Sequence, residues 1–271
     1  MQHYTLRHRI IAAISQQLFS DNVYVARRGL VAGLRRRGGL GFVPTWLQPE
    51  HETAEHRCLR EQRYEGRVVF DIGAFHGLTG LFFASRGGIV HAFEPMPQNR
   101  KRLQENLALN PGLTVTVHPL AVGAEPGRLD LVMDPRMPGG ASGSAKIQAG
   151  IAQGGAVLRE SVEVATLDAL HDAGRIPRPD FIKLDVEGFE APVLAGGQRL
   201  LSAARPDIFI ELHGEDLADK RDKTRAVLTE LAQAGYAEVR HVETGRVVSV
   251  ATLDDTTSRG HLLARGGAAQ A

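Results

Sequence analysis

The hydrophobic residues of this chain form short apolar runs separated by segments with helical periodicity. Four runs are mainly apolar and contain or adjoin acidic residues, a pattern typical of parallel strands buried on both faces: 68–70, 89–93, 180–184 and 207–212. Helical patterns lie between them, at 81–84, 99–110 and 191–201. This alternation predicts a doubly wound, mostly parallel α/β sheet with helices on both faces.

After a charged helix predicted over 218–234, the pattern changes from alternating strands and helices to consecutive strands. Two runs, 237–243 and 246–250, are joined by Thr244-Gly245 and predict an antiparallel hairpin, and 261–264 predicts a last edge strand. Two further strands, 129–133 and 161–165, flank a glycine-rich stretch. We expect residues 134–160 to form a loop over the substrate side of the site, since loops of this length are usually functional.

The stretch 67–95 combines a strand, a glycine turn, a helix and a second strand followed by an acid. Asp71 ends the first strand, Gly73 and Gly77 lie in the turn, and Glu94 follows at close to the ~20-residue distance of a ribose-binding acid. The turn lacks the second glycine of G-x-G-x-x-G, which makes room for a pyrophosphate. S-adenosylmethionine, which has a ribose and a cationic amino group but no phosphate, fits this pattern better.

Ligands of doubly wound sheets bind at the carboxyl ends of the strands. The polar residues expected there are Asp71, Glu94, Asp185, Glu187, Glu211 and His213. Lys183 is unusual because it lies inside an apolar strand. We expect it to pair with a strand-end carboxylate, because an unpaired charge in such a place would be costly.

Four sequence blocks, in this order, resemble the FkbM family of S-adenosylmethionine-dependent methyltransferases: VFDIGAFHG (69–77), FEPMPQNRKRLQEN (93–106), DFIKLDVEGFEAPVLAG (180–196) and IFIELH (208–213). The resemblance covers roughly residues 52–265, and the Lys183–Glu190 block is much more specific than the glycine turn. It implies the class I (Rossmann-like) methyltransferase fold, a mostly parallel seven-stranded sheet with an antiparallel final strand. It also implies O-methylation of a hydroxyl on a sugar or a secondary metabolite.

The resemblance assigns roles to individual positions. It implies that Asp71, Gly73 and Gly77 shape the methionine side of the cofactor site, that Glu94 binds the ribose hydroxyls and that Asp185 faces the sulfonium and the acceptor. Further cofactor-site positions are Ala74, Pro95, Ala121 and Val122, the last two near the adenine. The chain departs from the family at Phe75-His76, where Asn is common after G-A, so a hydrogen bond to the cofactor is either missing or supplied by His76.

Methyl transfer to a hydroxyl requires positioning first and deprotonation second. His213 or Asp185 is the expected base, with Lys183 beside them and His76 as an outside candidate. Each has a structural alternative, since His213 could bond a strand-end carbonyl and Asp185 could orient the cofactor or Lys183. Mg²⁺ held by Asp185, Glu187 and Glu211 is a third route. We rank it below metal-free catalysis, because the sequence has no dedicated metal spacing.

Composition limits the binding partners, metal sites and cellular locations that have to be considered. The formal net charge of the 271 residues is +1, which gives no reason to expect nucleic-acid binding. The single cysteine, Cys58, excludes an intramolecular disulfide framework and multi-cysteine zinc sites. No apolar run is long enough to span a bilayer, and no signal-peptide cleavage site follows the first apolar residues. We therefore expect a cytoplasmic location, while the small-molecule hydroxyl acceptor is what the resemblance to the FkbM family implies.

We expect the chain to divide into a basic N-terminal extension, 1–49, and a domain over 50–271 that the resemblance implies to be a methyltransferase domain. The extension has seven arginines and one acid, Asp21. Ile10, Ile14 and Leu18 predict one helix, and 23–34 predicts a second. We expect a helical cap on the main domain, which could alternatively dock on an anionic membrane, on a partner or on a second copy of the chain.

Two other functions remain open from the residues alone. An NAD-dependent oxidoreductase could use the same sheet, although the turn lacks the pyrophosphate glycine. A non-catalytic scaffold could retain a vestigial cofactor site, and Phe75 leaves room for that reading. The identity of the acceptor, whether a sugar, polyketide or peptide hydroxyl, has no readable motif.

Overall fold

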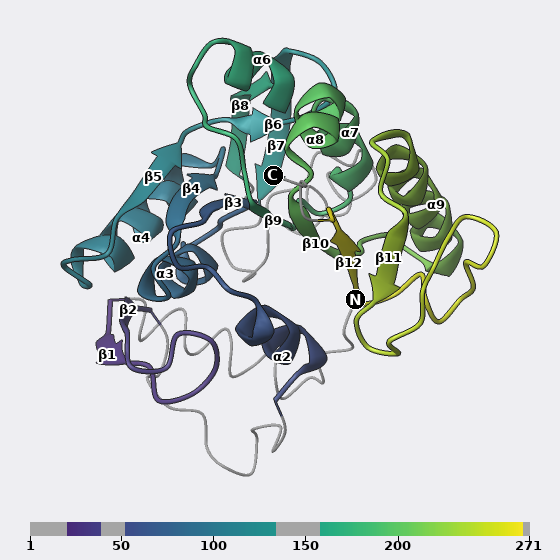
Figure 1. Ribbon diagram of the computed structural model, residues 1–271. Coiled ribbons are helices and arrows are strands. Elements are labelled where there is room, and N and C mark those ends of the chain that lie inside the picture. The colour runs from purple at the N-terminus through teal and green to yellow at the C-terminus, as the bar shows by residue number, and fades with distance from the viewer. Residues whose placement is uncertain (1–20, 39–51, 134–157, 268–271) are drawn as a thin grey trace.

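The computed structural model describes residues 21–38, 52–133 and 158–267 (Figure 1). Its main sheet has seven strands in the order β11-β12-β10-β9-β3-β4-β5. All neighbours are parallel except at β12, which runs antiparallel to β10 and β11. The bounds are β3 Val68–Ile72, β4 Ile89–Phe93, β5 Val115–His118, β9 Phe181–Leu184, β10 Asp207–Glu211, β11 Glu238–His241 and β12 His261–Arg265. The predicted doubly wound sheet with an antiparallel final strand is confirmed.

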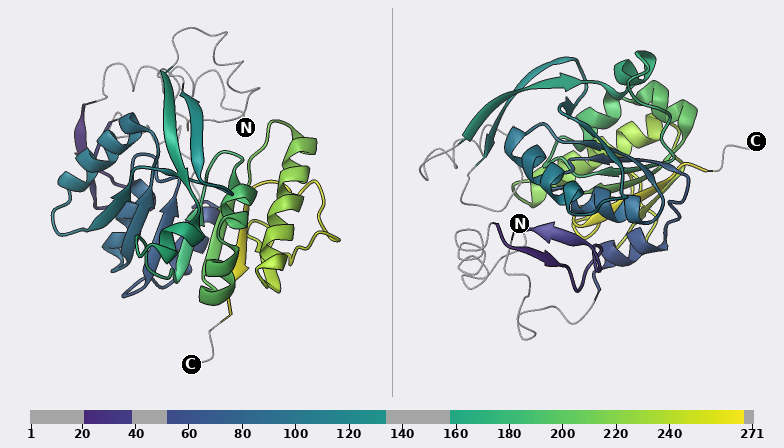
Figure 2. Two further views of the ribbon diagram at one scale, coloured as in Figure 1. Left: turned by 90° about the horizontal axis from the view of Figure 1, so that it is seen from above. Right: turned by 90° about the vertical axis from the view of Figure 1, so that its left-hand side faces the viewer.

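Helices cover both faces of this sheet (Figure 2). One face packs against α2 Ala54–Glu61, α3 Leu78–Ser85 and α4 Pro97–Ala108, and the other against α6 Leu167–Asp172, α7 Glu190–Ala195, α8 Gln198–Ala204 and α9 Leu217–Gln233. In β3, Val69 belongs to the first apolar layer and Phe70 to the second. Because both faces are covered, the central strands are apolar on both sides rather than alternating.

A second sheet, of three strands, is formed by the part of the chain between β5 and β9. It consists of β6 Ala121–Val122, β7 Gly127–Met133 and β8 Leu158–Ala165 in the order β6-β8-β7. Strands β7 and β8 correspond to the two extra strands predicted from the sequence. The predicted substrate-side loop, 134–160, lies outside the described residues except for its last three positions, which belong to β8.

The described part of the N-terminal extension differs from the sequence prediction. Residues 23–34 do not form a helix; β1 Val23–Val25 and β2 Arg35–Arg37 pair as an antiparallel hairpin. Gly29 and Gly33 have φ values of +78° and +90°, which an α-helix cannot include, and β-branched Val23 and Val25 favour a strand. The helix predicted around Ile10–Leu18 lies outside the described residues.

Two C-terminal predictions were wrong in detail. Residues 246–250 form no strand and make one bridge, between Arg240 and Val247. The partner of β11 is β12, which was predicted as an edge strand but lies between β10 and β11. Leu262, Leu263 and Ala264 are buried on both faces, as an interior strand requires.

The helix predicted over 191–201 is two helices, α7 and α8. The chain breaks at Gly196, where a side chain would meet the carbonyl oxygen of Gly123 at 2.0 Å. Close approach of two backbone segments therefore interrupts an otherwise helical pattern. Among the described helices, none has the length and hydropathy needed to cross a membrane.

Candidate functional site

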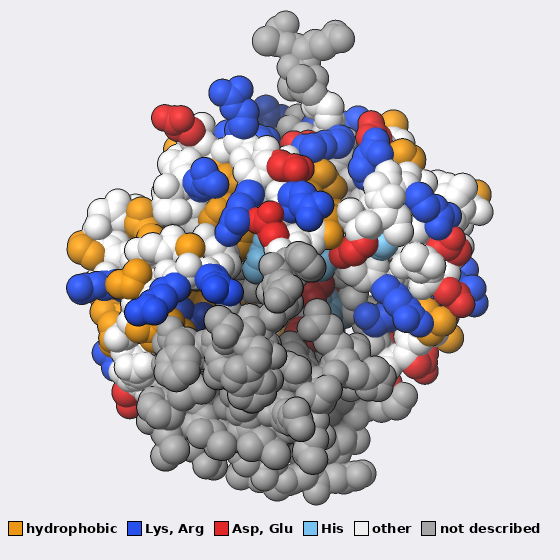
Figure 3. All heavy atoms as spheres, turned by 90° about the horizontal axis from the view of Figure 1, so that it is seen from below, with side chains coloured by type: hydrophobic (Ala, Val, Ile, Leu, Met, Phe, Trp, Pro, Cys, Tyr) orange, Lys and Arg blue, Asp and Glu red, His pale blue; other side chains and the backbone are white. Residues whose placement is uncertain are grey.

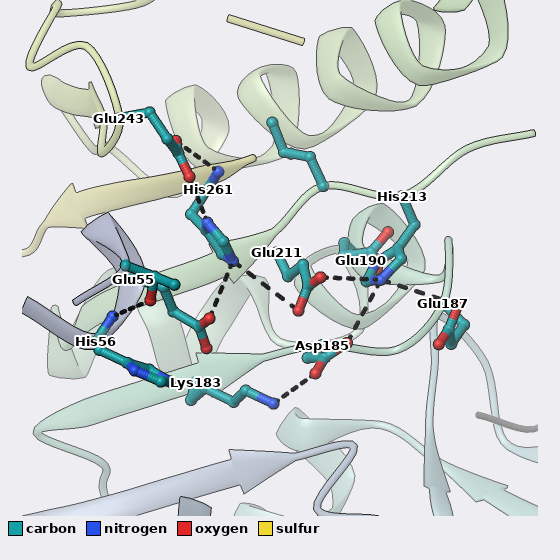
Figure 4. Close-up of polar contacts among 12 residues, drawn as sticks. Glu55, His56, Lys183, Asp185, Glu187, Glu190, Glu211, His213, Glu243 and His261 are labelled. Carbon is teal, nitrogen blue, oxygen red and sulfur yellow. Dashed lines mark hydrogen bonds and ion pairs between the residues drawn. The ribbon is translucent and has the colours of Figure 1, made fainter. Parts of the chain in front are cut away.

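The polar residues predicted at the strand ends lie at the carboxyl ends of neighbouring strands of the main sheet. Figure 4 shows four of them, Asp185, Glu187, Glu211 and His213. Asp71 lies in β3, Glu94 follows β4, Asp185 follows β9, and Glu211 ends β10. Strand order reverses at β3, since β4 lies on one side of it and β9 on the other. Sheets of this class bind ligands at that point. On the face seen in Figure 3, acidic and histidine side chains lie in a central recess, with lysine and arginine side chains around it.

The glycine turn after β3 is pressed against the end of β9. Gly73 has a φ of +86°, and a side chain on it would lie 1.7 Å from the carbonyl oxygen of Asp185. The N–H groups of Gly73 and Ala74 both donate to the carbonyl of Phe93, at 3.0 Å each. Gly77, at φ +77°, ends the turn and begins α3. The turn is therefore fixed to both neighbouring strands and positions Asp185 through backbone contact.

Glu94 is 4% exposed and receives three hydrogen bonds. Its Oε1 accepts from the N–H of Met96 at 3.0 Å and from Asn99 Nδ2 at 3.1 Å, and its Oε2 accepts from the N–H of Phe75 at 2.8 Å. Burial raises the pKa of the carboxyl, and these donors oppose the rise. A carboxylate has about four acceptor positions, so Oε2 keeps one for a ligand hydroxyl.

Phe75 and His76, the positions that depart from the family pattern, adopt a specific geometry. Phe75 has a φ of +50°, a conformation that Asn reaches more readily than Phe. The two rings stack at 3.7 Å, and Asn106 Nδ2 donates to the carbonyl of His76. Burial, Arg102 and Arg36 lower the pKa of His76 to about 4, so it is neutral at pH 7. The hydrogen bond that Glu94 receives from this turn comes from the Phe75 backbone.

Lys183 forms ion pairs with a carboxylate in β3 and with another directly after β9. Its ammonium is 2.7 Å from Asp185 Oδ2 and 3.9 Å from Asp71 Oδ1, which confirms the predicted pairing with strand-end carboxylates. Burial lowers the pKa of Lys183, but the two carboxylates outweigh it and the pKa is raised. Asp71 is fully buried and neither oxygen makes a hydrogen bond of normal geometry; burial raises its pKa to about 6, against the opposing charge of Lys183.

His213 connects Asp185 to the acidic segment after it. Its Nδ1 is 2.9 Å from Glu190 Oε1, and its Nε2 faces Asp185 Oδ1 at 3.6 Å. Glu190 is 2% exposed, and the same oxygen accepts from the N–H of Gly188. Burial would lower the pKa of His213, but Glu190, Asp185 and Glu187 raise it to about 9. His213 therefore has a high affinity for a proton in the ligand-free chain.

A second histidine extends the polar network and was missed from the sequence. His261, on β12, lies opposite Glu211 in the sheet register. Its Nδ1 is 2.6 Å from Glu243 Oε1, and its Nε2 lies 4.0 Å from Glu211 Oε2 and 3.9 Å from Glu55 of α2. His261 reaches this end of the sheet because β12 pairs with β10, and no local sequence signal indicates that pairing.

The positions assigned to the adenine side pack partly into the apolar cores. Val122 is 6% exposed and belongs to the main apolar core, while Ala121 is half-buried and packs with Met96, Leu131 and Val162. Pro95 is half-buried, and its carbonyl accepts a hydrogen bond from Arg100. Among the described residues, Asp185, Glu211 and His213 have ligand atoms within 4.8 Å of one another, an arrangement that could hold a metal ion.

Comparison with known proteins identifies relatives of this chain. The family model described as "Methyltransferase FkbM domain" matches residues 71–237. The hexuronic acid methyltransferase AglP of Haloferax volcanii is 31% identical over 171 residues, which are 62% of this chain and 64% of AglP. The chain thus spans just under two thirds of the length of that relative.

Solved structures resemble the chain more distantly. The crystal structure of Methyltransferase FkbM from Methylobacillus flagellatus is 20% identical, with 76% of this chain and 45% of that chain covered and a TM-score of 0.45. A TehB-like SAM-dependent methyltransferase from Corynebacterium glutamicum is 12% identical, with 79% and 86% covered and a TM-score of 0.41. The fold assignment therefore rests on the strand order of this chain.

Proposed function

The chain belongs to the FkbM methyltransferase family, and from that membership we propose that it transfers a methyl group from S-adenosylmethionine to a hydroxyl of a sugar or another small molecule. The observation that supports the proposal is that two sets of residues lie together at the carboxyl ends of the sheet strands. The glycine turn and Glu94 form one set, and Asp185 and His213 form the other, with Lys183 bonded to Asp185. The first set suits a nucleoside, and the second suits an acceptor and its proton.

The residues present fit S-adenosylmethionine. Glu94 would hold the ribose, because Oε2 retains an acceptor position next to the turn. Asp71, Gly73, Ala74 and Gly77 would shape the methionine end, and Ala121 and Val122 would bound the adenine, with Pro95 beside Glu94. The carboxylate of Asp185 suits the positive sulfonium and ammonium groups of this ligand.

When bound, the cofactor would supply a methyl group whose bond to sulfur breaks as the acceptor oxygen forms the new O–C bond, with S-adenosylhomocysteine as the leaving group. The hydroxyl proton of the acceptor would pass to a base of the protein. His213 is the proposed base, because Glu190 binds its Nδ1 and leaves Nε2 facing the recess. Its pKa of about 9 makes the deprotonated imidazole a strong base, which forms only after Nε2 has lost the proton that it holds at neutral pH. Lys183 acts as a positioning residue that fixes Asp185 through the 2.7 Å ion pair.

Calorimetric titration with S-adenosylhomocysteine tests the cofactor assignment. Glu94→Ala is expected to weaken binding by at least about tenfold, because a hydrogen bond to a charged acceptor contributes about 1.5–3 kcal/mol. Glu125→Ala, in an exposed turn, is the matched control and should bind like wild type. Binding of NADH without any binding of S-adenosylhomocysteine would instead favour an oxidoreductase, and equal affinity of both variants would remove Glu94 from the site.

The acceptor class is tested by mass spectrometry of methylated products. Because AglP is named a hexuronic acid methyltransferase, hexuronic acid glycosides come first in the panel, followed by neutral hexosides and small polyketide and peptide alcohols. We expect a mass gain of one methyl group on a sugar. No transfer to any member by protein that binds the cofactor would contradict the proposed acceptor class.

A further inference from the structure

His213 faces three carboxylates from two separate segments. Its Nε2 lies 3.6 Å from Asp185 Oδ1, 3.7 Å from Glu211 Oε1 and 3.9 Å from Glu187 Oε2 (Figure 4). Each distance exceeds that of a normal hydrogen bond to nitrogen. Atoms spaced in this way can be ligands of one ion, whose bonds to nitrogen and oxygen are about 2.0–2.2 Å.

The other side of the imidazole is already fixed. Glu190 is buried and lies 2.9 Å from Nδ1, and its oxygen is held in turn by the N–H of Gly188. A carboxylate can only accept, so Nδ1 carries a proton, and a metal ion that displaces the second proton would find the Nε2 lone pair directed at the three carboxylates. A carboxylate bound to the far nitrogen is the usual support of a metal-binding histidine.

The charge at these strand ends also calls for a cation. Asp185, Glu187, Glu190 and Glu211 are four carboxylates, and Lys183 is the ammonium paired with them through Asp185 Oδ2. These four carboxylates and Lys183 carry a formal charge of −2 while His213 holds both of its protons, and of −3 once the Nε2 proton has left. A divalent ion would compensate two of these charges and would leave the third for the cationic cofactor.

We propose that Asp185, Glu211 and His213 bind a divalent cation of the Mg²⁺ or Mn²⁺ class, with Glu187 as a fourth ligand and Glu190 orienting the imidazole. Oxygen-rich sites with one imidazole and no thiolate suit these hard ions. From the sequence we favoured metal-free catalysis and considered only Asp185, Glu187 and Glu211 as ligands. The structure adds His213 to that set and supplies its support.

The effect that such an ion would have on catalysis rests on the proposed function. An ion at the ends of β9 and β10 would lie beside Asp185, where the acceptor hydroxyl must lose its proton. A bound divalent ion lowers the pKa of a coordinated hydroxyl. With the ion bound, this effect would replace the role of His213 as base, because Nε2 cannot bind an ion and accept a proton at the same time. The favoured acceptors would therefore carry a second oxygen next to the reacting hydroxyl, as vicinal diols and hydroxy acids do, so that both oxygens bind the ion.

The test is a titration of the chelator-treated full chain with Mn²⁺ alone, followed by the electron paramagnetic resonance signal of the free ion. We expect one saturable site per chain, with Mg²⁺ competing. Glu211→Gln and His213→Gln should each weaken binding at least about tenfold, since even residues that only support a ligand contribute 10–100-fold. Glu190→Gln should have a smaller effect, and Glu238→Gln, on the exposed face of β11, should have none.

Several outcomes would overturn the proposal. They are the absence of saturable Mn²⁺ binding by folded wild type, and unchanged affinity in both Glu211→Gln and His213→Gln. Glu211 is 39% exposed, so its glutamine variant should fold, and thermal unfolding checks this. Titration with S-adenosylhomocysteine is independent: its binding without Mn²⁺ binding removes only the metal site, and Mn²⁺ binding without it removes only the proposed function.

Discussion

At the scale of single residues, the neighbours of His213 determine its proton affinity and its ability to bind a metal ion. It follows β10, where a histidine with ordinary surroundings would titrate near its usual pKa of 6.5. Buried Glu190 on one side and partly exposed carboxylates on the other stabilise its protonated form. The same carboxylates that make it a strong base also make it a suitable metal ligand once the proton has left.

The raised pKa of His213 makes stability depend on pH when no divalent ion is present. Because the folded pKa, about 9, is above the usual 6.5, the protonated form stabilises the folded state below pH 6.5. That contribution, up to about 3 kcal/mol, is lost as the pH rises through 9. We expect the stability difference between wild type and His213→Gln, measured by urea unfolding in chelator, to shrink between pH 6.5 and pH 9.5.

A stability difference that stays constant across this range would contradict the assignment. Other groups also titrate there, including His261, whose pKa is raised by Glu243 against the effect of burial. Because both proteins contain these groups, subtraction removes their contribution. The change with pH in the difference therefore reports His213.

At the scale of elements, the site depends on backbone contact between the glycine turn and the end of β9. The turn follows β3, and β3 pairs with β9 in parallel register, with Asp71 opposite Lys183. Gly73 then lies directly against the carbonyl of Asp185. One backbone contact therefore positions the proposed cofactor side against the proposed acceptor side.

Gly73→Ala is expected to destabilise the fold by about 3 kcal/mol or more. The new Cβ would combine a positive φ with a separation of 1.7 Å from the Asp185 carbonyl oxygen, so the backbone must move. The matched control is Gly66→Ala, where φ is +71° but no atom lies within 4 Å. It should cost about 1 kcal/mol from backbone strain alone. Equal costs for the two variants in denaturant unfolding would show that the close contact is unimportant.

At the scale of the whole molecule, the N-terminal hairpin is attached to the site through α4. Asn106 Oδ1 accepts from the N–H of Arg37 at 2.8 Å, and its Nδ2 donates to the carbonyl of His76 in the glycine turn. Asn110 binds both the N–H and the carbonyl of Arg35. Asn106 is fully buried, so these bonds are shielded from water.

Asn106→Ala should loosen this attachment. The substitution leaves the Arg37 N–H and the His76 carbonyl without these partners, at a cost of about 1–3 kcal/mol. Hydrogen exchange of residues 21–38 is expected to accelerate by about tenfold or more. Gln104→Ala, exposed on the same helix, should leave exchange unchanged. Unaltered exchange in Asn106→Ala would mean that the hairpin is held by its apolar contacts.

The sequence by itself determined the parallel part of the main sheet and most of the candidate site. Short runs that are apolar on both faces are typical of strands covered on both sides, and polar residues that end such strands lie close together where parallel strands end. Asp71, Glu94, Lys183 and Asp185 were found in this way, and pairing of Lys183 followed from the cost of an unpaired buried charge.

Only the tertiary structure decided the partners of these residues. The support of His213 by Glu190, the arrival of His261 and the fit of Gly73 against Asp185 join segments far apart in the chain. The order of β11 and β12, the break between α7 and α8 and the N-terminal hairpin likewise depend on contacts that local periodicity does not encode. Periodicity reports which face of an element is buried, whereas long-range packing decides what that face meets.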